Sequence, residues 1–358
     1  ISYRVTVSGQ YEIGCKVGSV QFQPAYLSIL PGPVSATSTV SEGNGLSRAF
    51  AGEQAELRVL VRDVFGNSQK SAGVRVYTSP RNTTFAKSVQ SILDGEQVIF
   101  TYLPTVSGDY KFYIMVGNTA IRTTPWTVDV SAGEVDAVKC QVDGKGSREA
   151  TAGDLASFVI SARDQYSNPL TYGGFTFVVH TKEEIATRRH SCADMGTGKY
   201  DCSYTTTTSG KLMLSIMMSF VHVTGSPFNI PVKPSLFNAG NAIIREPSMG
   251  MATAGRYDIL VMTARDRLGN FLETGWDNFI ISIENGGQSR ATSHVTDYKN
   301  GTYSIRYIST TSGRYSINIM YQGTPVANSP YGLLVVAAEA SALTSKITFP
   351  AGYSCVES

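Results

Sequence analysis

Apolar and polar residues alternate along much of this chain with a period of two, the spacing of side chains on the two faces of a β-strand. After Gly313, apolar residues at every second position are separated by Ser316, Asn318 and Met320. The same alternation follows Gly108 and Gly210, and the three runs place apolar residues at Tyr110, Phe112, Ile114 and Val116; Leu212, Leu214, Ile216 and Met218; and Tyr315, Ile317, Ile319 and Tyr321. No stretch has convincing helical spacing, so the pattern predicts an all-β protein.

Four short motifs recur in one order and at a nearly constant spacing. An Ala-Gly pair comes first, then an Arg-Asp pair that opens a turn of the form Asp-x-x-Gly-Asn or Asp-x-x-Ser-Asn, then Gly-x-Tyr or a near relative, and then a proline just before an aromatic residue. The Ala-Gly pairs end at Gly52, Gly153, Gly255 and Gly352, with separations of 101, 102 and 97 residues. Because chance does not easily place four motifs in the same order, an array of repeats is predicted.

The motifs divide the chain into three complete repeats, at 31–131, 132–234 and 235–337, and two incomplete ones. Residues 1–30 carry only the later motifs, so we expect the C-terminal half of a repeat there. Residues 338–358 carry only the earlier motifs, so we expect the N-terminal part of a further repeat there. About a hundred residues with roughly seven short strands is the size of an immunoglobulin-like β-sandwich.

The motif set is fullest in the third repeat. It includes Ala254-Gly255, Asp266-x-x-Gly269-Asn270, Asn300-Gly301-Thr302-Tyr303 and Asn328-Ser329-Pro330-Tyr331, and the second repeat adds Gly225-Ser226-Pro227-Phe228. These repeats resemble filamin-type immunoglobulin-like repeats, a group that includes extracellular gamete-adhesion proteins. The first repeat departs from the pattern, with Thr124-Pro125-Trp126 in place of Ser-Pro-Phe.

The resemblance implies tandem β-sandwiches that set distance and present surfaces. It also implies structural roles for the Asp, Gly and Pro motifs, in which Asp and Asn cap turn N–H groups and Gly or Asn accepts a positive φ. In filamin-like repeats the side of strands C and D accepts an added peptide strand. The run 175–180 is the candidate strand C of the second repeat.

Composition and motifs argue against catalysis and against nucleic-acid binding. The chain has 358 residues, of which 42% are hydrophobic and 16% charged, and its net charge is +2, which implies no bulk attraction to nucleic acid or anionic membrane. The four histidines form no tight ligand cluster, and Gly144-Lys145-Gly146-Ser147 lacks the spacing of a phosphate loop. No enzyme activity, cofactor or metal is therefore expected, and no stretch approaches the length of a membrane span.

Cys192 and Cys202 bracket a hairpin whose turn contains Gly196-Thr197-Gly198, so they can lie opposite each other on antiparallel strands. They can form a cross-strand disulfide, which implies an oxidising compartment, or remain small buried thiols. We favour the disulfide.

Cys15 and Cys355 lie in the two incomplete repeats. Cys15 aligns with Ile114, at an inward position of strand F, and Cys355 aligns with Ala55, at the start of strand B. A B–F pair is the usual inter-sheet disulfide of immunoglobulin domains, so an inter-subunit Cys15–Cys355 bond is one hypothesis. In that case the end of one copy completes the beginning of the next in a head-to-tail filament. The alternative, which we favour, is that both halves belong to an ordinary longer array.

Two function classes remain open. Sequons at Asn82 and Asn300, together with the Cys192–Cys202 spacing, favour an extracellular or cell-surface glycoprotein that acts in adhesion or as a filament through protein partners. The repeat family alone supports the alternative, a cytoplasmic filamin-like rod that crosslinks actin.

Overall fold

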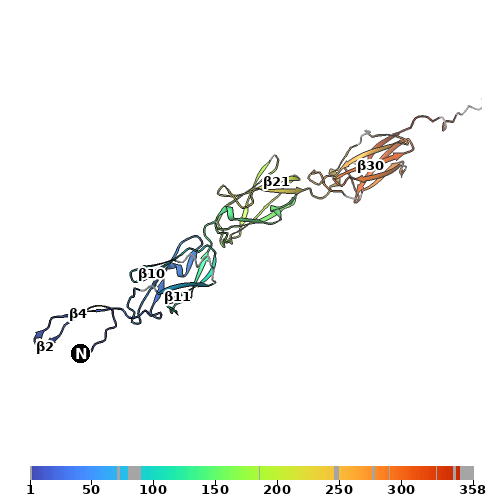
Figure 1. Ribbon diagram of the computed structural model, residues 1–358. Coiled ribbons are helices and arrows are strands. Elements are labelled where there is room, and N and C mark those ends of the chain that lie inside the picture. The colour runs from blue at the N-terminus through green and yellow to red at the C-terminus, as the bar shows by residue number, and fades with distance from the viewer. Residues whose placement is uncertain are drawn as a thin grey trace, which may run out of the picture.

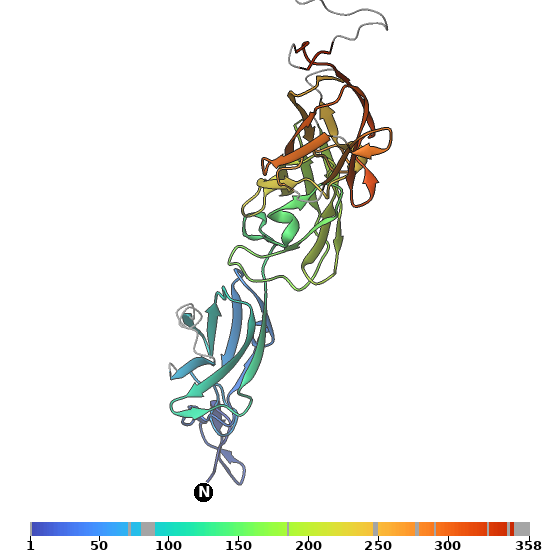
Figure 2. The same cartoon turned by 90° about the vertical axis from the view of Figure 1, so that its right-hand side faces the viewer.

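The computed structural model describes residues 2–70, 73–79, 90–184, 186–245, 250–275, 279–289, 291–327, 329–341 and 344–346. Within these ranges the regular structure is β-strand with a few short 3-10 helices, as the alternation predicts. None of the helices in the described part of the chain is long and apolar enough to cross a membrane. The repeats follow one another in a row, and Figures 1 and 2 show the same elongated arrangement from two sides.

Each complete repeat is a sandwich of one four-stranded sheet and one larger sheet. In the first repeat, β5 (Val40–Glu42), β7 (Ala55–Leu60), β10 (Gln97–Tyr102) and β9 (Gln90–Asp94) form one sheet, and β12 (Thr119–Ala120), β11 (Gly108–Val116), β13 (Trp126–Ser131), β6 (Arg48–Phe50) and β8 (Val74–Ser79) form the other. The 3-10 helix η1 (Asn44–Leu46) follows β5.

The second and third repeats have the same order of strands. The second contains β14 (Gln141–Asp143), β16 (Ala156–Ser161), β20 (Lys199–Tyr204) and β19 (Cys192–Asp194), and then β15 (Ala150–Thr151), β23 (Phe228–Lys233), β21 (Gly210–Met218), β17 (Phe177–Lys182), β18 (Thr187–His190) and β22 (Val221–His222). The third contains β24 (Ile243–Arg245), β26 (Tyr257–Thr263), β30 (Thr302–Ser309) and β29 (Ala291–Asp297), and then β25 (Met251–Thr253), β33 (Tyr331–Val336), β31 (Gly313–Tyr321), β27 (Phe279–Asn285), β28 (Gln288–Ser289) and β32 (Thr324–Pro325). Helices η2 (Ala137–Lys139), η3 (Lys145–Ser147) and η4 (Ala239–Asn241) are short 3-10 turns.

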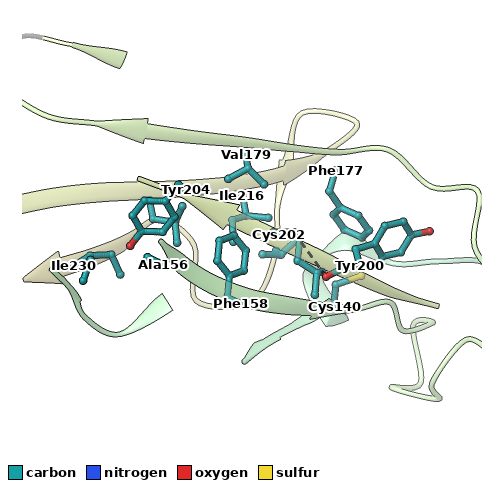
Figure 3. Packing of buried hydrophobic residues seen from close by; sticks show 14 of the residues in the cluster. Cys140, Ala156, Phe158, Phe177, Val179, Tyr200, Cys202, Tyr204, Ile216 and Ile230 are labelled. Carbon is teal, nitrogen blue, oxygen red and sulfur yellow. Dashed lines mark hydrogen bonds between the residues drawn. The ribbon is translucent and has the colours of Figure 1, made fainter. Parts of the chain in front are cut away.

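Each repeat has its own hydrophobic core between its two sheets. In the second repeat, Phe158 of one strand packs with Tyr204 of its neighbour, and Ile216 faces them from the other sheet (Figure 3). These side chains are nearly inaccessible to water, at 1%, 2% and 0% exposure. The alternating positions predicted from the sequence are therefore the core positions, and each complete repeat buries a core of its own.

A tyrosine ties the four-stranded sheet to the glycine-rich loop of each of the first two repeats. The hydroxyl of Tyr204 donates to the carbonyl of Gly146 at 2.7 Å, and Tyr102 donates to Gly45 in the same way. A Cβ atom on Gly146 would lie 2.8 Å from the Ala156 carbonyl carbon, so only glycine fits. The loop that faintly resembles a phosphate loop thus packs against its own sheet.

The hydroxyl residue before each motif proline has one recurring partner. The side-chain oxygens of Thr124, Ser226 and Ser329 accept the N–H groups of Ile114, Ile216 and Ile319, at 3.2, 2.8 and 2.7 Å. All three X–Pro peptides are cis. Threonine supplies the same hydroxyl as serine, so the departure in the first repeat preserves this contact.

Residues 2–30 form a lone hairpin in which β1 (Gly9–Ile13) pairs with β4 (Ala25–Ile29), extended by β2 (Lys16–Val17) and β3 (Val20–Gln21). The expected inward position of Cys15 is wrong here, because no sheet formed by the described residues covers the hairpin and the free thiol is exposed. Its proposed partner Cys355 lies outside the described residues.

Candidate functional site

The Asp-x-x-Gly-Asn or Asp-x-x-Ser-Asn turn of each complete repeat is organised by one fully buried carboxylate. Oδ1 of Asp164 accepts the N–H groups of Tyr166 and Asn168, at 2.9 and 2.8 Å. Asp63 and Asp266 make the equivalent pairs of bonds. The predicted capping role of the aspartate is confirmed, and the residue before each asparagine has positive φ even where it is Ser167.

The second carboxylate oxygen holds the segment that leads into the repeat. Oδ2 of Asp164 accepts the N–H of Gly133 at 2.9 Å and the Nδ2 group of Asn168 at 2.7 Å. In the other two repeats the linker donors are Gly32 and Ser235, again with the asparagine of the turn as the second donor. Each aspartate thus accepts four hydrogen bonds, three from its own turn and one that holds the linker.

Hydrogen bonding also decides the protonation state of the turn aspartate in the first and third repeats. Burial opposes ionisation of Asp63, but hydrogen bonds from Asn67, Gly32 and Phe65 outweigh it and lower its pKa to about 2. The same balance lowers the pKa of Asp266. The turns of the first and third repeats are therefore built around ionised carboxylates at neutral pH.

The asparagine of each turn reaches the preceding repeat. Nδ2 of Asn168 donates to the carbonyl of Thr105 at 3.0 Å, and its Oδ1 accepts the N–H of Ser107 at 3.0 Å. Its amide thus pairs with the neighbouring backbone as a strand residue would. Asn67 binds Thr6 and Ser8 in this way, and Asn270 binds Thr207 and Ser209.

Side chains of the turn also cover the Ala-Gly pair of the preceding repeat. A Cβ atom on Gly52 would lie 2.8 Å from the Tyr166 ring, and one on Gly153 would lie 2.6 Å from Nη2 of Arg267. Arg267 also donates to the carbonyl of Gly153 at 3.2 Å. These glycines are needed because the next repeat approaches closely, in addition to their positive φ of 89° and 84°.

We use the term inter-repeat joint for this assembly: the Asp-x-x-Gly-Asn or Asp-x-x-Ser-Asn turn of one repeat, together with the Thr-x-Ser loop and, in the two joints between complete repeats, the Ala-Gly pair of the repeat before it. The sequence predicts only a local capping role for the asparagine, and its bridge to the preceding repeat is not predicted. A signal was present, since Thr-x-Ser-Gly occurs at 6–9, 105–108, 207–210 and 310–313. Recurrence alone did not identify the partner of this loop.

The Thr-x-Ser loop is held by its own repeat. Gly52 donates to the carbonyl of Pro104 at 2.7 Å, which places the Ala-Gly pair beside the loop. The hydroxyl of Tyr110 donates to the carbonyl of Val106 at 3.1 Å. The tyrosine of the Gly-x-Tyr motif thus fixes the loop that the next repeat contacts.

The structure places the cysteines and sequons of the complete repeats as follows. Cys192 lies directly opposite Cys202 in the strand register, and the two are joined by a disulfide. Cys140 is a buried free thiol whose pKa is raised by burial. Asn300 is exposed in the turn between β29 and β30, whereas Asn82 lies outside the described residues.

The edge of strand C differs between repeats. The run 175–180 leads into β17, but β18 of the same chain pairs with that strand from Val179 to Lys182. In the third repeat β28 pairs with β27 only at Glu284 and Asn285. The predicted strand C of the second repeat is present as β17 from Phe177 onward, although β18 covers its edge. In the third repeat, β27 carries Ile280 at 69% exposure.

Among the described residues, no group of three or more His, Cys, Asp or Glu side chains is placed to hold a metal ion. The conspicuous charged motif residues serve the turns instead. In the part of the chain that the structure describes, the joint is a recurring polar arrangement, and it can position one repeat on another.

A family model for the Filamin/ABP280 repeat matches residues 33–127, 134–229 and 236–332. Filamin-C of Mus musculus is 23% identical over 338 residues, covering 94% of this chain and 11% of the relative. Filamin-A of Drosophila melanogaster is 20% identical over 230 residues, covering 64% of this chain and 10% of the relative. The chain thus spans about a tenth of the length of these curated relatives.

Among solved structures, FdeC, an Escherichia coli adhesin, is similar with a TM-score of 0.58 and 16% identity, covering 86% of this chain and 100% of that chain. At this identity the likeness concerns the fold alone.

Proposed function

This chain belongs to the family of Filamin/ABP280 repeat proteins, and from that premise we propose that it is a stiff structural and adhesive scaffold of a cell surface that works by protein–protein contacts. The observation that carries the proposal is the joint, which recurs three times with the same donors and acceptors. Chains linked only by flexible peptides need no such bridge. A fixed joint keeps repeats aligned, which suits a spacer that presents surfaces at a set distance.

The stiffness can be tested by removing the bridging amides. The double variant Asn168→Ala with Asn270→Ala loses the two hydrogen bonds that cross each of two joints, each contributing about 1 kcal/mol. It also loses the bond from each side-chain amide to the aspartate of its own turn. Small-angle X-ray scattering should then show a broader distribution of sizes and a smaller average dimension than in the wild type. Asn118→Ala, in an exposed hairpin turn, is the matched control and should leave the curve unchanged. A scattering curve unaltered by the double variant would contradict the proposal.

The surface location is supported by the disulfide and by the exposed sequon at Asn300. Intact mass of the protein from its native source, with and without glycosidase and reductant, tests it. A glycan on Asn300 or Asn82 and a bonded Cys192–Cys202 pair are expected. If both the glycan and the disulfide are absent, the result would favour the cytoplasmic alternative, a filamin-like rod that crosslinks actin.

The open edge of β27 in the third repeat is the proposed contact for a protein partner, by addition of an extended strand. The second repeat is a poorer candidate because β18 covers β17 and brings Arg188 and Arg189 to the new edge, where charges discourage pairing. A photo-crosslinking residue at position 280 should capture a partner that the same residue at position 189 does not. Equal capture at both positions would contradict this assignment.

Head-to-tail self-association is a further candidate mode of action. The hairpin of residues 2–30 exposes large apolar side chains, among them Tyr3 at 61%, Tyr26 at 75% and Leu30 at 80%. Light scattering of the purified chain under oxidising conditions tests this mode. A measured mass that increases with protein concentration, and that reductant returns to the monomer value, would support an inter-subunit bond between Cys15 and Cys355. A constant monomer mass would exclude this bond.

A further inference from the structure

The third repeat carries the acceptor half of an inter-repeat joint. Its Thr-x-Ser loop is Thr310-Thr311-Ser312, and its Ala-Gly pair is Ala254-Gly255. Gly255 donates to the carbonyl of Ser309 at 2.8 Å, as Gly52 does to Pro104 and Gly153 to Thr206. The acceptor half is therefore assembled in the same way in all three repeats.

The loop is also held in the same way. The hydroxyl of Tyr315 donates to the carbonyl of Thr311 at 2.8 Å, as Tyr110 donates to Val106 and Tyr11 to Val7. The hydroxyl of Ser309 adds a bond to the carbonyl of Thr311 and accepts its N–H. The backbone groups that would meet a partner are thus fixed before any partner arrives, which lowers the entropic cost of binding.

The third repeat differs from the first two in the exposure of this acceptor half. Thr310, Ser312 and Gly255 are exposed, and a Cβ atom on Gly255 would meet nothing within 4 Å among the described residues. At the two joints between complete repeats the corresponding glycines lie against side chains of the next repeat. The preceding alanines, Ala51 and Ala152, are 3% and 0% exposed, whereas Ala254 is only half-buried.

The chain itself indicates what covers such a surface. In each complete repeat the linker is followed by a turn in which a backbone N–H donates to the carbonyl three residues earlier. The pairs are Ser38 to Ser35, Lys139 to Asp136 and Asn241 to Asn238. Thr344 and Ser345 donate to the carbonyl of Ser341 in this manner. The segment after the third repeat thus starts as the earlier repeats start.

We propose that the Thr310–Ser312 loop, with Ala254-Gly255, is a docking site for the Asp-x-x-Gly-Asn or Asp-x-x-Ser-Asn turn of a further filamin-like repeat. The amide of the asparagine in that turn donates to the carbonyl of Thr310 and accepts the N–H of Ser312. A side chain from the middle of the turn covers Gly255. The site recognises a backbone-mimicking amide in a rigid turn, and this inference does not depend on where in the cell or outside it the protein acts.

The test appends a repeat in the correct register. Residues 132–233 are duplicated and fused after Val336, so that Ser312 stays in a unique peptide and the turn with the copy of Asn168 faces it. Amide hydrogen exchange then compares Ser312 in the original and the fused chain. We expect exchange at Ser312 to slow by about tenfold or more on fusion, since a bonded amide must open before it exchanges. Ser107 is the internal reference, because its N–H is bonded in both chains.

The matched control is the same fusion with the duplicated asparagine changed by the equivalent of Asn168→Ala. It should return Ser312 to fast exchange while the appended repeat retains its cooperative unfolding transition. If Ser312 exchanges equally fast with a folded repeat appended, or if its protection survives the alanine, the proposal is wrong. Neither outcome bears on the surface location, which the mass measurement tests separately.

Discussion

Single residues in this protein are specified by hydrogen bonds as much as by burial. The aspartate of each turn is 0% exposed yet accepts four hydrogen bonds, three from its own turn and one from the linker. A charge at such a position is stable only when its acceptor sites are filled. The asparagine four residues later has a different task, since it bonds both to the aspartate and across to the preceding repeat.

Acid should weaken the turns of the first and third repeats. The pKa of Asp63 is about 2 and that of Asp266 is lowered, while an aspartate in an unfolded chain has a pKa of about 3.9. A lowered pKa in the folded state means that this stabilisation is complete above about pH 4 and is lost as the pH falls towards about 2. Thermal unfolding midpoints measured from pH 6 to pH 2 should decrease over that window. Asp63→Asn should lose part of this pH dependence, and an unchanged slope would contradict the assignment.

The buried hydroxyl of Tyr204 should contribute measurably to the second repeat. Tyr204→Phe keeps the ring in the core but leaves the Gly146 carbonyl without its 2.7 Å partner. An unsatisfied buried acceptor costs about 1–3 kcal/mol. Urea unfolding of the variant should show this loss in the free energy of unfolding with an unchanged slope. Tyr166→Phe, whose ring lies at the surface of a joint, is a control expected to change stability far less.

At the scale of strands and hairpins, the repeats differ most along strand C. In the second repeat the chain between β18 and β19 passes from one sheet to the other, and β19 is then bonded to β20 by the disulfide. The covered edge of β17 and the open edge of β27 therefore arise from the same strand order with different intervening segments. The recurring motifs predict that these repeats are equivalent, although the edges of their C strands differ.

The disulfide should stabilise the second repeat and leave the other repeats unaffected. A disulfide between cysteines with a sequence separation of 10 restricts the unfolded chain, which raises the free energy of the unfolded state by about 2–3 kcal/mol. The double variant Cys192→Ala with Cys202→Ala should lose about this amount in denaturant unfolding of that repeat. Cys140→Ala is not a suitable control because Cys140 is in the core, so reduced wild-type protein serves instead. Reduced protein as stable as oxidised protein would contradict this expectation.

At the scale of the whole molecule, three separate cores are connected by small polar joints. Phe158→Ala should destabilise the second repeat by about 3–5 kcal/mol, the usual cost of removing a fully buried phenylalanine. Because the joints consist of a few hydrogen bonds and close contacts, the first and third repeats should keep their own cooperative unfolding. Hydrogen exchange resolved by peptide would show accelerated exchange confined to the second repeat. Equal acceleration in all three repeats would mean that the joints couple folding strongly.

The sequence by itself determined the strands, the repeat period, the family resemblance and the local role of the turn aspartates. These follow from the period of two and from backbone requirements of Asp, Gly and Pro that act within a few residues. Only the tertiary structure decided where the asparagines bond, because Asn168 and Ser107 are 61 positions apart and meet only when two folded repeats are stacked. It also decided that β18 covers the edge of β17, and that Cys15 is exposed. Each depends on which segment comes to lie against an element, and alternation along one strand carries no information about its neighbour.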